Sequence, residues 1–312
     1  MARRITVAAA SSDFVILDPA RDDERNVEEV RRYLASLVDP VLSDRPDLVL
    51  LPEVCDRPDN FEMPRRVEYY RRRGERILDH FRQTAREHHC WIVYPAERQD
   101  DAGAWRNAAW VIDRQGRIAG VYDKMFVTLS QMEEDGFTCA TEIPLFDTEV
   151  GRAGMAICYD LNFPEMLASY EKSRPDLILF PSHFHGSFLA EYWAYASRAW
   201  VLGAIARHEC YLVAPTGAVV ARSGPGRRFL TASINLDRCV VHCEWDELGK
   251  LESLKRRHGE GVSIVEAGFG GNYLVASETL GSSAESMVRE AGLATLDTHP
   301  RTTGRRGAWR GI

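Results

Sequence analysis

Two stretches of the chain nearly repeat each other: RPDLVLLPEV at Arg45–Val54 and RPDLILFPSH at Arg174–His183. Each runs Arg-Pro-Asp, then four apolar residues, then Pro, which is the pattern of a short buried strand introduced by turn residues. Because the copies match in both length and register, they favour two similar halves over a chance recurrence of common strand punctuation. They differ after the proline, where the first copy has Glu53 and the second has Ser182.

Short apolar runs alternate with amphipathic stretches around both copies. Apolar residues spaced three and four apart from Val27 to Val38 predict a helix, and residues 64–89 predict a longer one with a charged outer face. In the second half, the pattern predicts helices over 164–172 and about 188–203. Strands alternating with helices in this way indicate an α/β protein.

Two hairpins complete the pattern. The runs NAAWVID and IAGVYDK flank the turn residues 114–117, and CYLVAPTGAVVAR over 210–222 has the same form. The segment after Gly259 is rich in Gly, Ser and Arg with weak periodicity. We therefore expect a main domain at 1–258 and a C-terminal extension at 259–312, either a tail or a subunit-contact segment.

Composition excludes several classes of protein. The chain has 312 residues, 45% hydrophobic and 27% charged, as expected of a soluble globular protein. Its 39 basic and 46 acidic residues give a net charge of −7, which argues against a nucleic-acid partner. No apolar run reaches membrane-spanning length, and the first residues fit a strand over 5–10 better than a signal peptide, so we expect a cytoplasmic protein.

The seven cysteines are odd in number, irregular in spacing and without a CxxC pair, so they predict neither a zinc site nor a disulfide framework. Cys158 differs from the other six because it lies in GMAICYDLNFPE, Gly154–Glu165. An apolar strand there runs into a turn, and Pro164 suits the first turn of a helix. A thiol at such a turn is exposed and has backbone N–H groups nearby, so it is a candidate nucleophile. The alternative is an inert buried thiol.

Four further residues are candidates for chemistry. Glu53 follows a buried strand, where apolar neighbours would raise the pKa of its carboxyl and suit it to act as a base; the alternative is a helix cap or salt bridge. Lys124 ends the strand of IAGVYDK and is either a charge stabiliser or a surface lysine. His183 and His185 follow the second RPDL strand and are either partners of Cys158, metal ligands or residues of a pocket rim.

The order of these strand ends resembles the nitrilase superfamily, the carbon–nitrogen hydrolases, from about Ile5 to Asp237. The motif LLPE matches Leu50–Glu53, Y-x-K matches Tyr122–Lys124, and F-D-T…G-R-x-G…I-C-Y-D-L-x-F-P-E matches Phe146–Glu165. The resemblance implies an α-β-β-α sandwich of two pseudo-symmetric halves that assembles as a homodimer or a higher homo-oligomer. The sequence departs from the family at Cys139-Ala140, where Pro-Gly is usual, and over 198–202, where a Glu-Asn pair is absent.

The resemblance also implies site residues. Glu53 would be the general base, Lys124 the transition-state stabiliser and Cys158 the nucleophile. Glu134, or alternatively Glu133, would be a second glutamate that orients Lys124 or the substrate. The predicted substrate-binding residues are Tyr159, whose backbone N–H would bind the oxyanion, His183, Phe184 and His185 at the pocket border, and Arg198. The candidates for binding a substrate carboxylate are Arg198, Arg207, His183 and His185; the alternative for each arginine is a salt bridge on a helix surface.

The expected function is hydrolysis of a small-molecule amide or N-carbamoyl compound through a thioester, without metal or organic cofactor and without a membrane partner. The Cys-Tyr-Asp sequence resembles amidase and carbamoylase branches and so favours these substrates over a nitrile. Three alternatives remain: a nitrilase, a catalytically silent binding protein with the same fold, and a papain-like hydrolase that pairs Cys158 with His183 or His185.

Overall fold

The computed structural model describes residues 2–224, 226–267 and 271–298, and the chain folds into two compact units. The larger unit spans residues 4–234, and the smaller one contains the described residues from Asn235 to residue 298 together with residues 2–3. The boundary therefore lies at Asn235 and not at the predicted position after residue 258. The predicted boundary fails because strands on both sides of residue 258 belong to one sheet.

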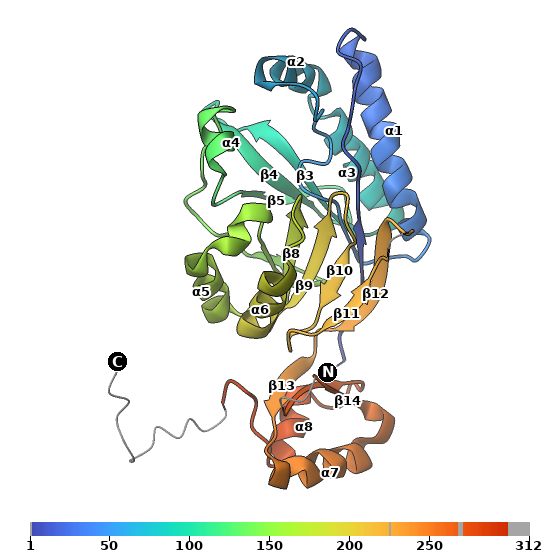
Figure 1. Ribbon diagram of the computed structural model, residues 1–312. Helices are drawn as coiled ribbons and strands as arrows, with labels where there is room; N and C mark the ends of the chain where they lie inside the picture. Colours follow the sequence, from blue (N-terminus) through green and yellow to red (C-terminus); the bar gives the residue numbers. More distant parts are fainter. Residues whose placement is uncertain (1, 225, 268–270, 299–312) are drawn as a thin grey trace, which may run out of the picture. The chain divides into compact units, whose positions relative to one another are not determined.

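The larger unit contains two six-stranded sheets (Figure 1). The first has the strand order β12-β1-β2-β3-β4-β5 and consists of β1 (Arg4–Ala10), β2 (Leu48–Leu50), β3 (Trp91–Gln99), β4 (Trp105–Ile112), β5 (Ile118–Asp123) and β12 (Phe229–Asn235). The second has the order β11-β10-β9-β8-β7-β6 and consists of β6 (Phe146–Thr148), β7 (Gly151–Met155), β8 (Leu177–Ser182), β9 (Trp200–Ile205), β10 (Tyr211–Val213) and β11 (Val219–Arg222).

The two sheets repeat the same strand pairings, which confirms the prediction of two similar halves. In the first, β1, β2 and β3 are parallel and β4 and β5 continue antiparallel. In the second, β7, β8 and β9 are parallel and β10 and β11 continue antiparallel. Both predicted hairpins are present, as β4–β5 and β10–β11.

The two RPDL stretches have the same backbone conformation and make the same kind of contact in each half. Arg45 and Arg174 both adopt a left-handed backbone conformation, with φ of 51° and 49°. The carboxylate of Asp47 accepts the backbone N–H of Thr6 at 2.8 Å, and that of Asp176 accepts the backbone N–H of Arg152 at 3.1 Å. Each aspartate therefore anchors its strand to the parallel neighbour, β2 to β1 and β8 to β7.

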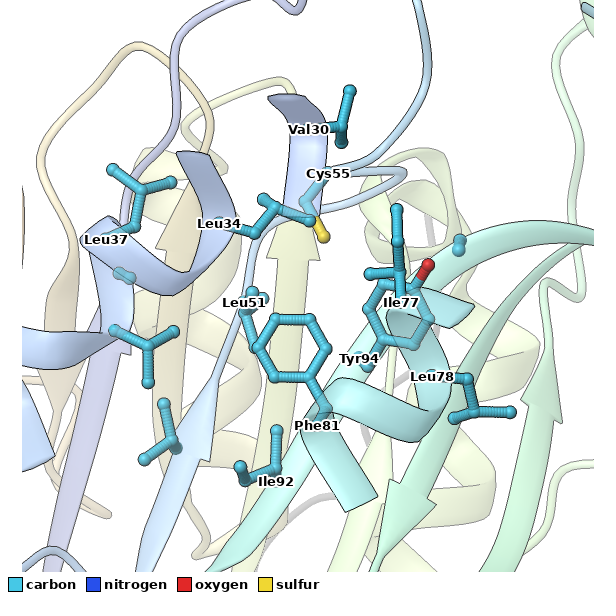
Figure 2. Packing of buried hydrophobic residues seen from close by; sticks show 14 of the residues in the cluster. Val30, Leu34, Leu37, Leu51, Cys55, Ile77, Leu78, Phe81, Ile92 and Tyr94 are labelled. Carbon is cyan, nitrogen blue, oxygen red and sulfur yellow. The ribbon is translucent and has the colours of Figure 1, made fainter. Parts of the chain in front are cut away.

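Helices cover the outer faces of the sheets, which makes the predicted α-β-β-α sandwich. The helices of this unit are α1 (Asp23–Leu42), α2 (Met63–Arg73), α3 (Arg76–His88), α4 (Leu129–Glu133), α5 (Pro164–Ser173) and α6 (Ser187–Ser197). Helices α1 and α3 pack on the first sheet, α5 and α6 lie together on the second, and β1 and β9 bring the two sheets into contact. Figure 2 shows the core under α1 and α3, where Leu34 and Phe81 meet Leu51 from the end of β2.

One predicted helix is divided in two, and another ends earlier than expected. The stretch 64–89 is broken at Gly74, which has φ of +49° and separates α2 from α3. The predicted helix over 188–203 stops at Ser197, because Arg198 takes a left-handed conformation and the apolar run from Trp200 is the fully buried strand β9. An apolar run of this length fits a buried strand and a buried helix segment equally well by pattern alone.

The smaller unit is built on the sheet β13-β15-β14. Its elements are β13 (Arg238–His242), η2 (Trp245–Glu247), α7 (Leu248–His258), η3 (Gly259–Gly261), β14 (Val262–Glu266), β15 (Asn272–Ser277) and α8 (Ala284–Glu290). Val241, Leu254, Val275 and Met287 meet in its core. The prediction of an extended tail after Gly259 is thus wrong for residues 262–290, while residues 299–312 lie outside the described residues. No helix of the described ranges has the length and apolar character that a membrane span needs.

Close packing inside the second sheet gives a stability prediction. A Cβ atom on Gly203 of β9 would lie 2.7 Å from Tyr211 Cζ, and the Tyr211 hydroxyl donates to the His185 carbonyl oxygen at 2.7 Å. We expect Gly203→Ala to lower the free energy of unfolding by about 1–3 kcal/mol, because Tyr211 must move to make room. Gly226→Ala is the control, since its Cβ would meet nothing within 4 Å. Urea denaturation measures both; equal stability of the two variants would contradict the packing described.

Candidate active site

Glu53, Lys124 and Cys158 come together at the carboxyl ends of three strands. Glu53 follows β2, Lys124 directly follows β5, and Cys158 begins the 3₁₀ turn η1 (Cys158–Asn162) after β7. Lys124 Nζ lies 2.8 Å from Glu53 Oε1, and the two side chains are only 1% and 4% exposed. Both charges act on the Cys158 thiol. The structure thus places the three predicted catalytic residues in one cluster.

The Glu53 carboxylate has hydrogen-bond donors on both oxygens. Oε1 accepts from Asn107 Nδ2 at 2.7 Å as well as from Lys124, and Oε2 accepts from the His183 backbone N–H at 3.2 Å. Burial by itself raises the pKa of Glu53, but the Lys124 charge, the nearby His183 side chain and these hydrogen bonds outweigh it and lower the pKa to about 2. The predicted raised pKa is therefore wrong, because apolar shielding is only one of several effects on this carboxyl.

Cys158 has the opposite shift. Burial and the neighbouring Glu53 carboxylate raise the pKa of its thiol to about 11, although Lys124, the Ser182 hydroxyl and the His183 backbone N–H each act to lower it. The backbone of Cys158 is held at φ of 51°, a left-handed conformation that non-glycine residues seldom adopt outside functional sites. At neutral pH the resting cluster therefore consists of a thiol, a carboxylate and an ammonium.

Ser182 and Glu53, the residues that distinguish the two RPDL copies, both lie beside this thiol. Ser182 is fully buried at the end of β8, and its hydroxyl is held by the backbone N–H and carbonyl of Phe184, at 2.9 and 2.6 Å. The two similar strand ends thus supply different groups to one site: a carboxylate from the first half and a hydroxyl from the second.

Asp160 ties the turn carrying Cys158 to the strand end carrying Lys124. Its Oδ1 accepts the Phe126 backbone N–H at 2.8 Å, and its Oδ2 accepts the Ile157 backbone N–H at 2.8 Å and the Tyr122 hydroxyl at 2.7 Å. Burial raises the pKa of Asp160 to about 6. Sequence reasoning did not assign this residue or Asn107; the only signal was an aspartate two positions after the candidate nucleophile.

Glu134 does not lie where the resemblance had placed it. It is exposed at the end of α4, where the Ser130 hydroxyl donates to it at 3.3 Å, and Glu133 is exposed as well. Gln131 is the α4 residue that contacts Lys124, with Oε1 3.3 Å from Nζ. The reason is local: a capping box with Thr128 orients the Gln131 side chain toward the start of the helix.

The predicted substrate-binding residues fall into two groups. Tyr159 on η1 and His183, Phe184 and His185 after β8 lie at the same end of the sheet as Cys158. Arg198 does not, because it immediately precedes β9, whose Trp200 pairs with Leu177 at the start of β8. Its guanidinium lies over the Tyr195 ring at 4.6 Å. Arg198 therefore belongs to the opposite edge of the sheet, and its proposed role in carboxylate binding is withdrawn.

The other six cysteines form no disulfide. Cys55, Cys90, Cys210 and Cys243 are buried, Cys139 and Cys239 are partly buried, and all six are free thiols. Among the described residues, no group of three or more His, Cys, Asp or Glu side chains is arranged to hold a metal ion.

The fold is that of the nitrilase superfamily, as the sequence resemblance implied. Residues 4–241 match the family model described as carbon-nitrogen hydrolase, so the chain belongs to the carbon-nitrogen hydrolase family.

Similar curated proteins include amidases. The chain is 31% identical over 155 residues to the nitrilase and fragile histidine triad fusion protein NitFhit of Caenorhabditis elegans, a match covering 45% of this chain and 34% of that protein. It is 24% identical to the deaminated glutathione amidase of Dictyostelium discoideum, over 54% of this chain and 63% of that protein. It is 23% identical to the omega-amidase NIT2-B of Xenopus laevis, over 74% and 95%. The chain thus spans only part of the first two relatives.

Solved structures share the fold at low identity. The NitFhit protein of C. elegans superimposes with a TM-score of 0.65 at 18% identity, covering 93% of this chain and 98% of that one. Nit3 of Saccharomyces cerevisiae superimposes with a TM-score of 0.62 at 18% identity, covering 74% and 90%.

The protonation states of the cluster predict how Cys158 reacts with iodoacetamide. Because its pKa is about 11, alkylation of the native protein should be slow at pH 7 and should accelerate steadily toward pH 10. Glu53→Gln removes a charge that raises this pKa, so the variant should react about tenfold faster at pH 7 for each unit by which the pKa falls.

Peptide mass spectrometry of the Cys158 peptide follows the reaction, with Cys158→Ala as the blank and circular dichroism to verify folding. Slower alkylation of Glu53→Gln would contradict this arrangement, since it would mean that Glu53 already holds the thiol proton in the resting site.

Proposed function

We propose that this chain is an amidase that hydrolyses a small amide or N-carbamoyl compound through a thioester on Cys158. One observation carries the proposal: a thiol at a strand-to-helix turn lies in the field of a carboxylate and an ammonium that are paired at 2.8 Å. A nucleophile, a base and a cation to stabilise the oxyanion are the three groups that the hydrolysis of an unreactive amide requires.

In the first step Cys158 attacks the carbonyl carbon. Its proton passes to Glu53 as the C–S bond forms, because the thiol pKa of about 11 and the carboxyl pKa of about 2 make prior transfer unfavourable. The oxyanion is then stabilised by Lys124 and by the Tyr159 backbone N–H, which lies in the first turn of η1, where N–H groups have no partner within the turn. Loss of one such donor typically lowers the rate about 10²–10³-fold.

The second step releases the acid. Glu53 gives its proton to the leaving nitrogen, ammonia or amine departs, and a thioester to Cys158 remains. Glu53, again a carboxylate, takes a proton from water, whose oxygen attacks the thioester carbon. The thiolate leaves and takes the proton back from Glu53, which restores the resting cluster. Gln131 and Asn107 keep Lys124 and Glu53 in position throughout.

Two observations favour an amide over a nitrile: relatives of the chain are named amidases, and Cys158 stands in a Cys-Tyr-Asp sequence. The papain-like alternative has weaker support. The His183 imidazole Nε2 lies 3.1 Å from the Glu53 backbone carbonyl oxygen, to which it donates as the Nε2–H tautomer, so its hydrogen bond is made to the backbone and not to the thiol.

The proposal predicts ammonia release from a panel of ω-amides, N-carbamoyl amino acids, N-carbamoyl amines and short nitriles. We expect turnover of at least one amide or N-carbamoyl member and none by Cys158→Ala. Glu53→Gln should lower kcat about 10²–10⁴-fold, as is typical when a general base is lost, whereas His183→Ala should lower it less than about tenfold. A larger loss of kcat in His183→Ala than in Glu53→Gln supports the papain-like mechanism. Absence of ammonia release from every panel member by the folded protein contradicts the amidase proposal.

A further inference from the structure

The larger unit contains a cavity whose lining contacts the loop that follows β8. It has a volume of about 390 Å³ and is lined by Ser11, Asp13, Arg207, His208, Glu209, Gly224, Arg227 and Arg228. These residues come from three connections of the larger unit: the segment after β1, the β9–β10 turn and the β11–β12 loop. None of the three predicted catalytic residues lines this cavity, so it is a separate space for a ligand group.

Two of the three arginines in this cavity lack a carboxylate partner. Arg228 pairs with Asp13, and Glu209 pairs with Arg222, which lies outside the lining. Among the described residues, neither Arg207 nor Arg227 donates a guanidinium hydrogen bond or forms an ion pair. The cavity therefore holds a local excess of positive charge in a chain whose net charge is −7.

Both unpaired guanidinium groups lie over aromatic rings. Arg207 Cζ lies 4.1 Å from the ring centroid of Phe14, and Arg227 Cζ lies 4.2 Å from that of Phe229. Stacking uses the face of a guanidinium group and leaves its edge N–H groups free in the plane. An edge of this kind binds both oxygens of a carboxylate or a phosphate at once.

A chain of contacts through Phe14 and His183 links the cavity to the catalytic cluster. The Phe14 ring that carries Arg207 also stacks on His183, with ring centroids 6.1 Å apart, and His183 donates its backbone N–H to Glu53. His185, from the same loop, approaches the cavity residue Glu209 at 3.5 Å. One aromatic ring therefore separates Arg207 from the loop that borders Cys158.

Resting on the amidase function proposed above, we propose that this cavity binds an oxyanion, a carboxylate or phosphate group, at the far end of the substrate. The Arg207 guanidinium group forms hydrogen bonds to the oxyanion, and Arg227 adds a second positive charge. The amide end of the same molecule reaches Cys158. The specificity of the enzyme then lies in the β9–β10 turn and the β11–β12 loop, on the far side of His183 from the nucleophile.

The test uses three amides of equal chain length that end in a carboxylate, a phosphonate or a methyl group. The wild-type protein should prefer an anionic probe, and the preferred one identifies the oxyanion. Arg207→Met keeps an apolar chain against Phe14 and removes the charge. It should lower kcat/KM for the anionic probe about 10–100-fold, the usual effect of losing a charged hydrogen bond, and leave the methyl probe within about twofold.

Arg227→Met should act in the same direction, and the double variant should abolish the preference. The control is Arg32→Met, an α1 arginine whose side chain is 74% exposed and paired with Glu28. No preference in the wild-type protein, or an equal loss on all three probes in Arg207→Met, overturns the proposed cavity.

A binding measurement separates this proposal from the amidase function. Glutarate and inorganic phosphate are titrated against Cys158→Ala with and without Arg207→Met and Arg227→Met, and binding is followed by calorimetry. Binding of either anion that both arginine substitutions abolish supports the cavity even if no amide is hydrolysed. Absence of binding, or binding that survives in the triple variant, overturns it, whereas ammonia release from the methyl probe alone leaves the amidase function standing.

Discussion

The buried ion pair between Lys124 and Glu53 is the interaction on which the rest of the site depends. Two charges removed from water at 2.8 Å separation are tolerated only when their remaining hydrogen-bonding positions are filled, and breaking such a pair typically costs about 3–5 kcal/mol. Here Asn107 and the His183 backbone N–H donate hydrogen bonds to the Glu53 carboxylate, and the Gln131 side-chain oxygen accepts one from Lys124. The pair keeps the carboxylate ionised, and that carboxylate in turn keeps Cys158 protonated until a substrate arrives.

The duplicated architecture explains how such a pair is held. Asp47 and Asp176 anchor β2 and β8 to their parallel neighbours in the same way, so Glu53 and Ser182 are delivered from equivalent strand ends. Asp160 then fixes the Cys158 turn to residues on either side of Lys124, because it accepts hydrogen bonds from the Tyr122 hydroxyl and the Phe126 backbone N–H. Each group that the proposed chemistry uses therefore stands on a strand end or a bonded turn, where little reorganisation is needed during the reaction.

Much of this arrangement could be predicted from sequence. The RPDL repeat indicated two halves, the hairpin signals located β4–β5 and β10–β11, and the motif around Cys158 identified the family. The wrong predictions share a physical cause: tertiary contacts select between structures that the local sequence pattern fits equally well. The apolar run from Trp200 becomes a strand because it pairs with β8, and Arg198 consequently falls at the wrong edge of the sheet. Gln131, and not Glu134, contacts Lys124 because a helix capping box with Thr128 orients its side chain. The pKa of Glu53 is lowered because its charged and hydrogen-bonding partners outweigh the effect of burial.

The most direct measurement is a search for the acyl-enzyme. The wild-type protein, quenched with acid during turnover of an amide, is digested and examined by mass spectrometry. The account predicts that the peptide containing Cys158 gains the mass of the acyl group, that neutral hydroxylamine removes this mass, and that Cys158→Ala gains none. Turnover without an adduct, or an adduct on another residue, would contradict nucleophilic catalysis by Cys158.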